Sequence, residues 1–250
     1  VTWFEHASGF VQSIYPGWHT LADEKEWEHI NWEQPNEVKI KELCEQMLEY
    51  NVKICPTLVC NDQADIYPNY WSPENIVIDS VKNDTTLFDH WKASETQADA
   101  IKQQLGRFNK FTKIVAKTYF DLGGTVVTGT DTPALLWTYP GMALHRELEL
   151  FVEIGFTEME TLQAATINAA KSINLDHVGV IKEGYFADLV VLDANPLENI
   201  QHTRKISQII KGGKKYSQKD VLSHAPGKEN MEEMLKKFEE EWEKIMSESN

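Results

Sequence analysis

A carboxylate at the end of a short apolar segment is the first feature of this sequence that suggests chemistry. The segment Thr125-Val-Val-Thr-Gly-Thr-Asp131 is rich in β-branched residues and is followed by Pro133, a pattern typical of a buried parallel strand. Asp131 would then lie at the carboxyl end of that strand, where barrel enzymes keep their catalytic groups. There it is able to bind a metal ion or move a proton. The alternative is an aspartate that caps the next turn.

Two histidines add possible ligands. His6 directly follows the apolar pair Trp3-Phe4, and neutral imidazole suits zinc as well as carboxylate does. Without further context, the surroundings of His6 favour a structural histidine over a metal ligand. His145 follows Asp131 by fourteen residues and is expected early in the next helix. It is either a contact for substrate or for Asp131, or a histidine packed against the sheet. Arg146 and Glu147 beside it are expected to form an ion pair.

The elements that must position these residues alternate between strands and helices. Strands are predicted at residues 2–6, 52–59 and 125–131, and helices at 37–50, 108–122, 142–154 and 157–173. Thr157 and Glu160 have the spacing of a capping box at the start of the last of these helices. Strands that alternate with helices indicate an α/β fold with a parallel sheet.

The chain changes character after the last of these helices. Residues 179–184 predict a tight turn between strands, and residues 187–193 and 206–213 predict strands of a small antiparallel β element. In the tail, residues 228–246 have apolar side chains at spacings of four and three, which predicts an amphipathic helix.

Two long segments, roughly 10–35 and 61–105, interrupt the regular order and contain aromatic residues and His19, His29 and His90. Because such a long connection after a strand normally has helices of its own or acts as a lid, residues 61–105 are expected to be partly helical. They should lie over the carboxyl ends of the strands. Their aromatic side chains would either line a substrate pocket or anchor the loop by packing.

Composition excludes several classes of partner. The formal charge is −15 and the hydrophobic fraction 42%. Nucleic acids and anionic membranes both require basic patches, so neither is expected as a partner. The three cysteines form no CxxC pair, which argues against a disulfide framework and against a zinc site built from thiols. Nothing in the sequence assigns a cellular compartment.

Several motifs in the right order resemble the amidohydrolase superfamily, in its imidazolonepropionase-like and Xaa-Pro dipeptidase-like branch. The matching segments are Phe4-Glu5-His6-Ala7-Ser8-Gly9, Pro56-Thr57-Leu58, Gly129-Thr130-Asp131-Thr132, Gly141-Met-Ala-Leu-His-Arg-Glu-Leu148, residues 161–170, and residues 179–197. The first three resemble the ends of that family's barrel strands six, seven and eight. The last resembles the return of the chain into a small β-sandwich.

This resemblance implies a fold, a cofactor and roles for residues. Residues 1–178 would be the C-terminal part of a (β/α)8 barrel, 179–216 part of the β-sandwich, and 217–250 a C-terminal amphipathic helix. His6 and Asp131 would bind one or two zinc ions, and Asp131 would also transfer the proton in the hydrolysis of a C–N bond by a metal-activated water. The substrate would be a small molecule or short peptide containing a peptide, cyclic amide or amidine bond.

The sequence also departs from the family pattern, because it has no His-x-His pair of the kind that the family carries on strand one. The chain is therefore expected to need the N-terminal half of the same protein as a partner, and a homo-oligomer is possible. Two alternatives stay open. One is a deaminase that uses the same site, and the other is a truncated or degenerate copy that serves as a non-catalytic binding or scaffold protein.

Overall fold

The computed structural model describes residues 3–6, 8–17, 25, 28–75, 78–79, 85–134, 136–223 and 236–237. The chain divides into two compact units, Val1–Phe186 with Ala194–Lys205, and Ala187–Asp193 with Ile206–Asn250. Within the described ranges, no helix has the length and apolar character needed to cross a membrane. The helix predicted at 228–246 lies outside the described residues apart from 236–237, and so does His19.

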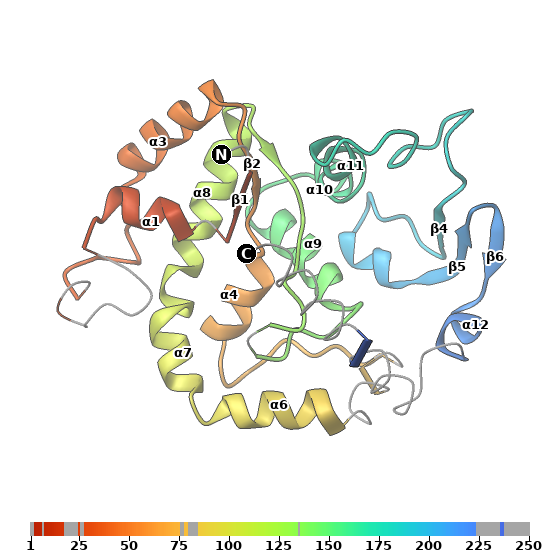
Figure 1. Cartoon of the computed structure of the whole chain (residues 1–250), viewed down its shortest axis with the longest axis horizontal. Helices are drawn as coiled ribbons and strands as arrows, with labels where there is room; N and C mark the ends of the chain where they lie inside the picture. Colours follow the sequence, from red (N-terminus) through yellow and green to blue (C-terminus); the bar gives the residue numbers. More distant parts are fainter. Residues whose placement is uncertain are drawn as a thin grey trace. The chain divides into compact units, whose positions relative to one another are not determined.

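A parallel sheet organises the first unit (Figure 1). Its strands are β1 (Trp3–Glu5), β2 (Lys53–Cys55) and β3 (Thr125–Val126), with β2 in the middle. Both β1 and β3 run parallel to β2, and Ile54 is the register partner of Phe4 on one side and Val126 on the other. The prediction of three adjacent parallel strands is therefore confirmed.

Helices of the first unit connect and cover these strands, and α3 and α8 pack against each other beside the sheet (Figure 1). The helices of this unit are α1 (Ser8–Ile14), α3 (Glu37–Glu49), α4 (Leu58–Asp65), α6 (Thr85–Glu95), α7 (Ala98–Gln104), η1 (Gly106–Phe108), α8 (Asn109–Asp121), α9 (Ala143–Glu153), α10 (Glu158–Ala165), α11 (Ile167–Ser172) and η2 (Ile200–Arg204). Asn36 caps α3 by accepting a hydrogen bond from the backbone N–H of Lys39.

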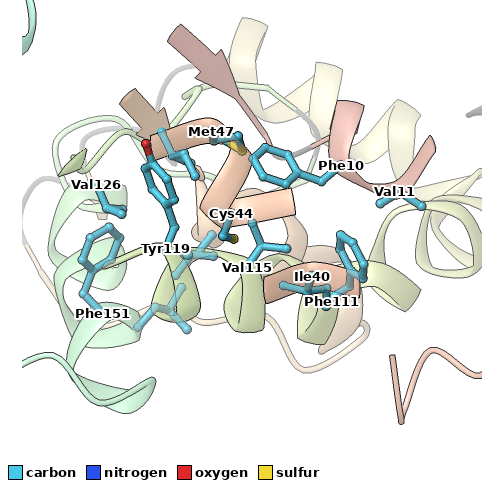
Figure 2. Close-up of a cluster of buried hydrophobic side chains, with 14 of the residues drawn as sticks. Phe10, Val11, Ile40, Cys44, Met47, Phe111, Val115, Tyr119, Val126 and Phe151 are labelled. Atoms are coloured by element: carbon cyan, nitrogen blue, oxygen red, sulfur yellow. The ribbon is translucent and has the colours of Figure 1, made fainter. Parts of the chain in front are cut away.

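The main apolar core lies between the sheet and these helices. Figure 2 shows side chains from α1, α3, α8, β3 and α9 meeting in it, among them Phe10, Ile40, Val115 and Phe151. Tyr119 is fully buried there, and its hydroxyl donates a hydrogen bond of 2.6 Å to the carbonyl of Val52. Burial on this scale accounts for most of the stability of such a unit.

The second strand differs from its prediction. Residues 52–59 were predicted to be one strand, but β2 ends at Cys55 and Leu58 already begins α4. Pro56 has no N–H to continue the ladder, and Thr57 has a left-handed backbone (φ 46°, ψ 50°) that turns the chain into the helix. The side chain that caps the start of α4 comes from Glu147, far along the sequence.

The helix predicted at 157–173 is two helices. Its capping box is confirmed, because Thr157 accepts from Glu160 N–H while the Glu160 carboxylate accepts from Thr157 N–H. The helix breaks at Thr166 (φ −127°, ψ −92°). Gly179 lies against this break, where an added Cβ would come within 2.9 Å of Ile167 Cα.

The predicted turn at 179–184 does not join two strands, since residues 173–188 contain none. The second unit instead contains an antiparallel sheet in the order β4 (Leu189–Leu192), β5 (Ile206–Lys211) and β6 (Lys214–Tyr216). Lys211 and Gly212 both donate to the carboxylate of Asp188 at the turn between β5 and β6. The short helix α12 (Gln218–Ser223) follows. The assignment of 1–178, 179–216 and 217–250 to a barrel, a β-sandwich and a helix remains a prediction.

Candidate active site

The carboxyl ends of the three parallel strands bring three polar side chains together. His6 follows β1, Thr57 follows β2 after Pro56, and Asp131 ends the extended segment after β3. The ladder continues slightly past the strands, since His6 N–H donates to Cys55 O and Val127 N–H donates to Ile54 O. Parallel strands end at one edge of a sheet, so the order of the strands alone places these residues side by side.

The same three residues have left-handed backbones. Their φ angles are 61° for His6, 46° for Thr57 and 49° for Asp131. Residues other than glycine rarely adopt this conformation, and for a β-branched residue such as threonine it is a genuine outlier. Such conformations cost about 1–3 kcal/mol each and concentrate at functional sites. Here they reverse the chain where each strand ends.

The imidazole of His6 lies between the other two side chains. Its Nδ1 is 2.6 Å from the Thr57 hydroxyl oxygen, which is a short hydrogen bond. Its Nε2 is 3.7 Å from Asp131 Oδ2, and the two side chains are 43% and 48% exposed. The second distance exceeds the normal range for a hydrogen bond. The imidazole and the carboxylate therefore face each other across a gap that solvent can reach.

This gap fits a metal ion in part. Two ligands bound about 2.1 Å from a tetrahedral ion lie roughly 3.4 Å apart, which is close to the observed separation of 3.7 Å. An imidazole nitrogen and a carboxylate oxygen are also suitable donors for zinc. Within the described residues, however, no group of three or more His, Cys, Asp or Glu side chains is arranged to hold a metal. His6 and Asp131 can thus supply two ligands of a site whose usual protein complement is three.

Glu147 supports the site from beneath. It is fully buried in α9, and its two carboxyl oxygens accept hydrogen bonds of 3.0 and 2.8 Å from the backbone N–H groups of Leu58 and Val59. Burial raises the pKa of Glu147 to about 8, even though both backbone N–H groups favour its charged form. Glu147 therefore caps α4 directly after Thr57 and fixes the backbone at the end of β2.

Two buried cysteines hold the loop that leads to Asp131. The Cys60 thiol donates to the Thr130 carbonyl at 3.0 Å, and burial raises its pKa, as do the carboxylates of Asp131 and Glu147. It therefore stays protonated and able to donate. At Gly129 an added Cβ would lie 2.3 Å from the sulfur of Cys55, so only glycine fits. Cys44, Cys55 and Cys60 are all free and buried.

The predicted ion pair between Arg146 and Glu147 is wrong. Arg146 instead donates to Asp62 through Nε at 3.1 Å and Nη2 at 2.8 Å, and Lys113 donates to the same carboxylate at 2.9 Å. Asp62 is 3% exposed, so both cations compensate a buried charge. Successive residues on a helix point in different directions. Arg146 therefore pairs with Asp62 within α4, whereas Glu147 caps the start of α4.

His145 lies near the start of α9, as predicted, and its side chain contacts Thr203. Its Nδ1 is 2.9 Å from the Thr203 hydroxyl oxygen. Burial, together with the charge of Arg204, lowers the pKa of His145 to about 4. His145 is therefore neutral at ordinary pH. Its role towards substrate or Asp131 stays a prediction.

The aromatic side chains of residues 61–105 pack together with the loop that follows Asp131. Trp91 is fully buried, and its indole N–H donates to Pro133 O at 3.1 Å. The described part of this segment is partly helical, as predicted, and Trp91 joins it to the loop that follows β3. The members of this aromatic cluster include Tyr67, Tyr70, Trp71, Phe88, Trp91, Trp137 and Tyr139. Their burial favours the packing role over the pocket-lining role.

Gln63 and Thr57 are the residues that sequence reasoning missed. Gln63 is fully buried, donates to the carbonyls of Trp71 and Trp137, and accepts from Trp71 N–H. Nothing in its sequence neighbourhood indicates this role. For Thr57 a signal was present, since it follows a strand directly after a proline at the level of His6 and Asp131. In barrels of parallel strands, the catalytic residues lie at this end of the strands.

Comparisons with known proteins match this architecture. The profile of the amidohydrolase family matches residues 80–216. Ochratoxinase of Aspergillus niger is 39% identical to the chain over 98 residues, which are 37% of this chain and 19% of that protein. The matched segment thus spans about a fifth of the length of this curated relative.

Two solved structures show a similar arrangement of the backbone. A Xaa-Pro dipeptidase with methionine bound in its active site superposes with a TM-score of 0.54 and 18% identity, over 87% of this chain and 40% of that one. Bottromycin amidohydrolase superposes with a TM-score of 0.61 and 17% identity, over 88% of this chain and 46% of that one. At these identities the likeness concerns the fold alone. The chain corresponds to less than half of each of these enzymes.

Proposed function

This chain belongs to the amidohydrolase family, and we propose that it is the part of a metal-dependent hydrolase that contributes His6 and Asp131 to the active site. The resemblance predicted from the motifs is confirmed by the family match. One structural observation carries the proposal. The imidazole of His6 and the carboxylate of Asp131 face each other at 3.7 Å, at the carboxyl ends of parallel strands.

In the proposed complete fold, β1, β2 and β3 are strands six, seven and eight of a (β/α)8 barrel. The parallel order of these strands and the overlap with larger enzymes support this assignment. The antiparallel strands β4, β5 and β6 would belong to a small β-sandwich. The N-terminal half of the same protein would then supply the other barrel strands and the remaining metal ligands.

Each residue has a role that its surroundings permit. His6 would bind the metal through Nε2, since Nδ1 is engaged by Thr57. Asp131 would bind beside it and, being about half exposed, would take a proton from the attacking water and deliver it to the leaving nitrogen. A divalent ion held between them would activate the water and polarise the substrate carbonyl. Cys60 would keep Asp131 in place by holding the carbonyl of Thr130.

The proposed substrates are small molecules or short peptides with a C–N bond, such as a peptide, cyclic amide or amidine bond. The names of the similar proteins support this class, since one is a Xaa-Pro dipeptidase and another an amidohydrolase. Zinc is the ion we propose, because one imidazole and one carboxylate suit it.

The test is made in the protein that contains this chain and its proposed N-terminal half. Asp131→Asn should leave the fold intact and reduce turnover of a dipeptide panel at least ~10²-fold, the scale of a lost proton-transfer group. His6→Ala should mainly reduce the zinc content. The matched control is Asp89→Asn, which changes an exposed carboxylate in α6.

Near-normal turnover in Asp131→Asn would overturn the proposed site. Ammonia is measured in the same assay, because its release without peptide cleavage would indicate a deaminase. If no hydrolysis occurs even with the N-terminal half and zinc present, a non-catalytic role becomes the better interpretation.

A further inference from the structure

Thr57 occupies the N-cap position of α4 but does not cap the helix. Threonine is favoured at this position because its hydroxyl normally accepts a hydrogen bond from a backbone N–H in the first turn. Thr57 makes no such side-chain bond. Its hydroxyl oxygen lies 2.6 Å from Nδ1 of His6 instead. The hydroxyl group therefore contacts His6, directly after β1, and does not cap α4.

Glu147 performs the capping that Thr57 leaves undone. Its carboxyl oxygens accept from the N–H groups of Leu58 and Val59, and the Val59 N–H is one of the groups that an N-cap side chain ordinarily satisfies. Thr57 is 3% exposed and Glu147 fully buried, so water does not readily replace either contact. The buried carboxyl group thereby frees the Thr57 hydroxyl.

The contact with Thr57 determines which ring nitrogen of His6 is free. If Nδ1–H donates to the Thr57 hydroxyl oxygen, Nε2 holds a lone pair that faces Asp131. In the other tautomer the Thr57 hydroxyl would donate to Nδ1, so it holds the ring in the same orientation in either tautomer. Metal binding through Nε2 requires the tautomer in which Nδ1–H donates to the hydroxyl. A histidine that binds a metal normally donates its other ring N–H to a neighbouring oxygen, which fixes the tautomer.

We propose that Thr57 is a positioning residue that holds the His6 ring with Nε2 towards Asp131 and accepts Nδ1–H when Nε2 binds a metal, and that Glu147 frees the Thr57 hydroxyl for this task by capping α4. This inference rests on the proposed function in one respect, namely that Nε2 of His6 is the atom that binds the metal. The left-handed backbone of Thr57 fits the same role, because the strained turn brings the hydroxyl to the ring.

The test compares three variants of the full protein. Thr57→Val removes the hydroxyl and keeps the shape, whereas Thr57→Ser keeps the hydroxyl. Thr161→Val is the matched control, since Thr161 is fully buried and its hydroxyl has no hydrogen-bond partner among the described residues. The readouts are the NMR chemical shifts of the His6 ring nitrogens in metal-free protein, and the affinity for Zn²⁺ alone.

In Thr57→Val the His6 nitrogen shifts should change, because Nδ1 loses its hydrogen-bond partner, and zinc affinity should fall about 10–100-fold, the usual effect of losing such a partner. Thr57→Ser and Thr161→Val should match the wild type in both readouts. Unchanged His6 nitrogen shifts in Thr57→Val would overturn the proposal. A loss in Thr57→Ser equal to that in Thr57→Val would also overturn it, because it would indicate a purely structural role.

Glu147→Gln tests the second part of the proposal. Glutamine has one acceptor oxygen where the carboxyl group has two, so one N–H of α4 would lose its partner and attract the Thr57 hydroxyl. The His6 shifts should move in the same direction as in Thr57→Val, by less. Wild-type His6 nitrogen shifts in this variant would refute the role of Glu147. The shifts are read without metal or substrate, so absence of hydrolase activity alone would overturn the proposed function and leave this inference standing.

Discussion

Burial determines which ionisable groups around the site carry charge. Burial raises the pKa of Glu147 to about 8 and lowers that of His145 to about 4. In both cases it favours the neutral form, as expected for groups removed from water. The imidazole at the start of α9 therefore adds little charge near neutral pH, whereas the two backbone N–H groups that donate to Glu147 oppose the effect of burial there. The exposed pair His6 and Asp131 is left to interact with solvent and ligands.

The shifted pKa of His145 predicts a dependence of stability on pH. Its pKa is 6.5 ordinarily and about 4 in the folded chain, so the unfolded chain binds the proton at the higher pH. Stability from this group is complete above about pH 6.5 and falls as the pH drops towards 4. The loss should reach about 2 kcal/mol, given partial solvent screening.

Urea unfolding at several pH values measures this effect. His145→Gln should flatten the profile between pH 6.5 and 4, and His90→Gln, at an exposed position in α6, is the control. An unchanged pH profile in His145→Gln would contradict the assignment.

Gly129 and Cys55 predict a pairwise effect. A Cβ at position 129 would lie 2.3 Å from the Cys55 sulfur, so Gly129→Ala should lower the free energy of unfolding by about 1–3 kcal/mol through overpacking. Cys55→Ala removes the sulfur and makes room. In a double-mutant cycle the two changes together should cost less than their sum. Additive costs would show that the two sites do not touch.

At the scale of elements, the sequence predicted what local patterns determine. The parallel strands, the helices at 37–50, 108–122 and 142–154, and the capping box at Thr157 all follow from periodicity and short-range spacing. The end of β2 did not, because the cap of α4 comes from Glu147, about ninety residues away. For the site, the motifs pointed to His6 and Asp131 but not to the buried groups that orient them.

Gln63 holds the aromatic cluster and predicts an effect at this scale. Its side chain makes three hydrogen bonds to the backbone of Trp71 and Trp137. Gln63→Met would leave these groups without a partner and should cost about 2–4 kcal/mol. Urea unfolding followed by tryptophan fluorescence measures the loss. Gln103→Met, at an exposed position in α7, should change stability by less than about 0.5 kcal/mol.

Equal stability of Gln63→Met and Gln103→Met would mean that the aromatic cluster is held by packing alone. In that case the hydrogen bonds of Gln63 would not contribute to the stability of the cluster.

At the scale of the whole molecule, the parallel sheet has open edges within the described residues. β1 and β3 each pair only with β2 in this part of the chain. Unpaired strand edges attract other strands, and a closed barrel removes them. This arrangement supports the proposed N-terminal half as the missing neighbour on both sides.

The chain expressed by itself should therefore bind zinc weakly, show no appreciable hydrolase activity and self-associate. Sedimentation, metal analysis and a dipeptide assay measure these three properties. Addition of the proposed N-terminal half should restore zinc binding and activity and suppress self-association. A stable monomer of the 250-residue chain with stoichiometric zinc would show that the site is completed in another way.

The left-handed backbones of His6, Thr57 and Asp131 also bear on how this gene changes over generations. Glycine or asparagine adopts that conformation more readily than the present residues do. A lineage that no longer needs activity would gain stability by such replacements, because selection then acts on folding alone. Decayed copies should lose these three residues before they lose core residues such as Ile54 or Phe151. The residues found at the three strand ends thus record whether a given copy is still under selection for catalysis.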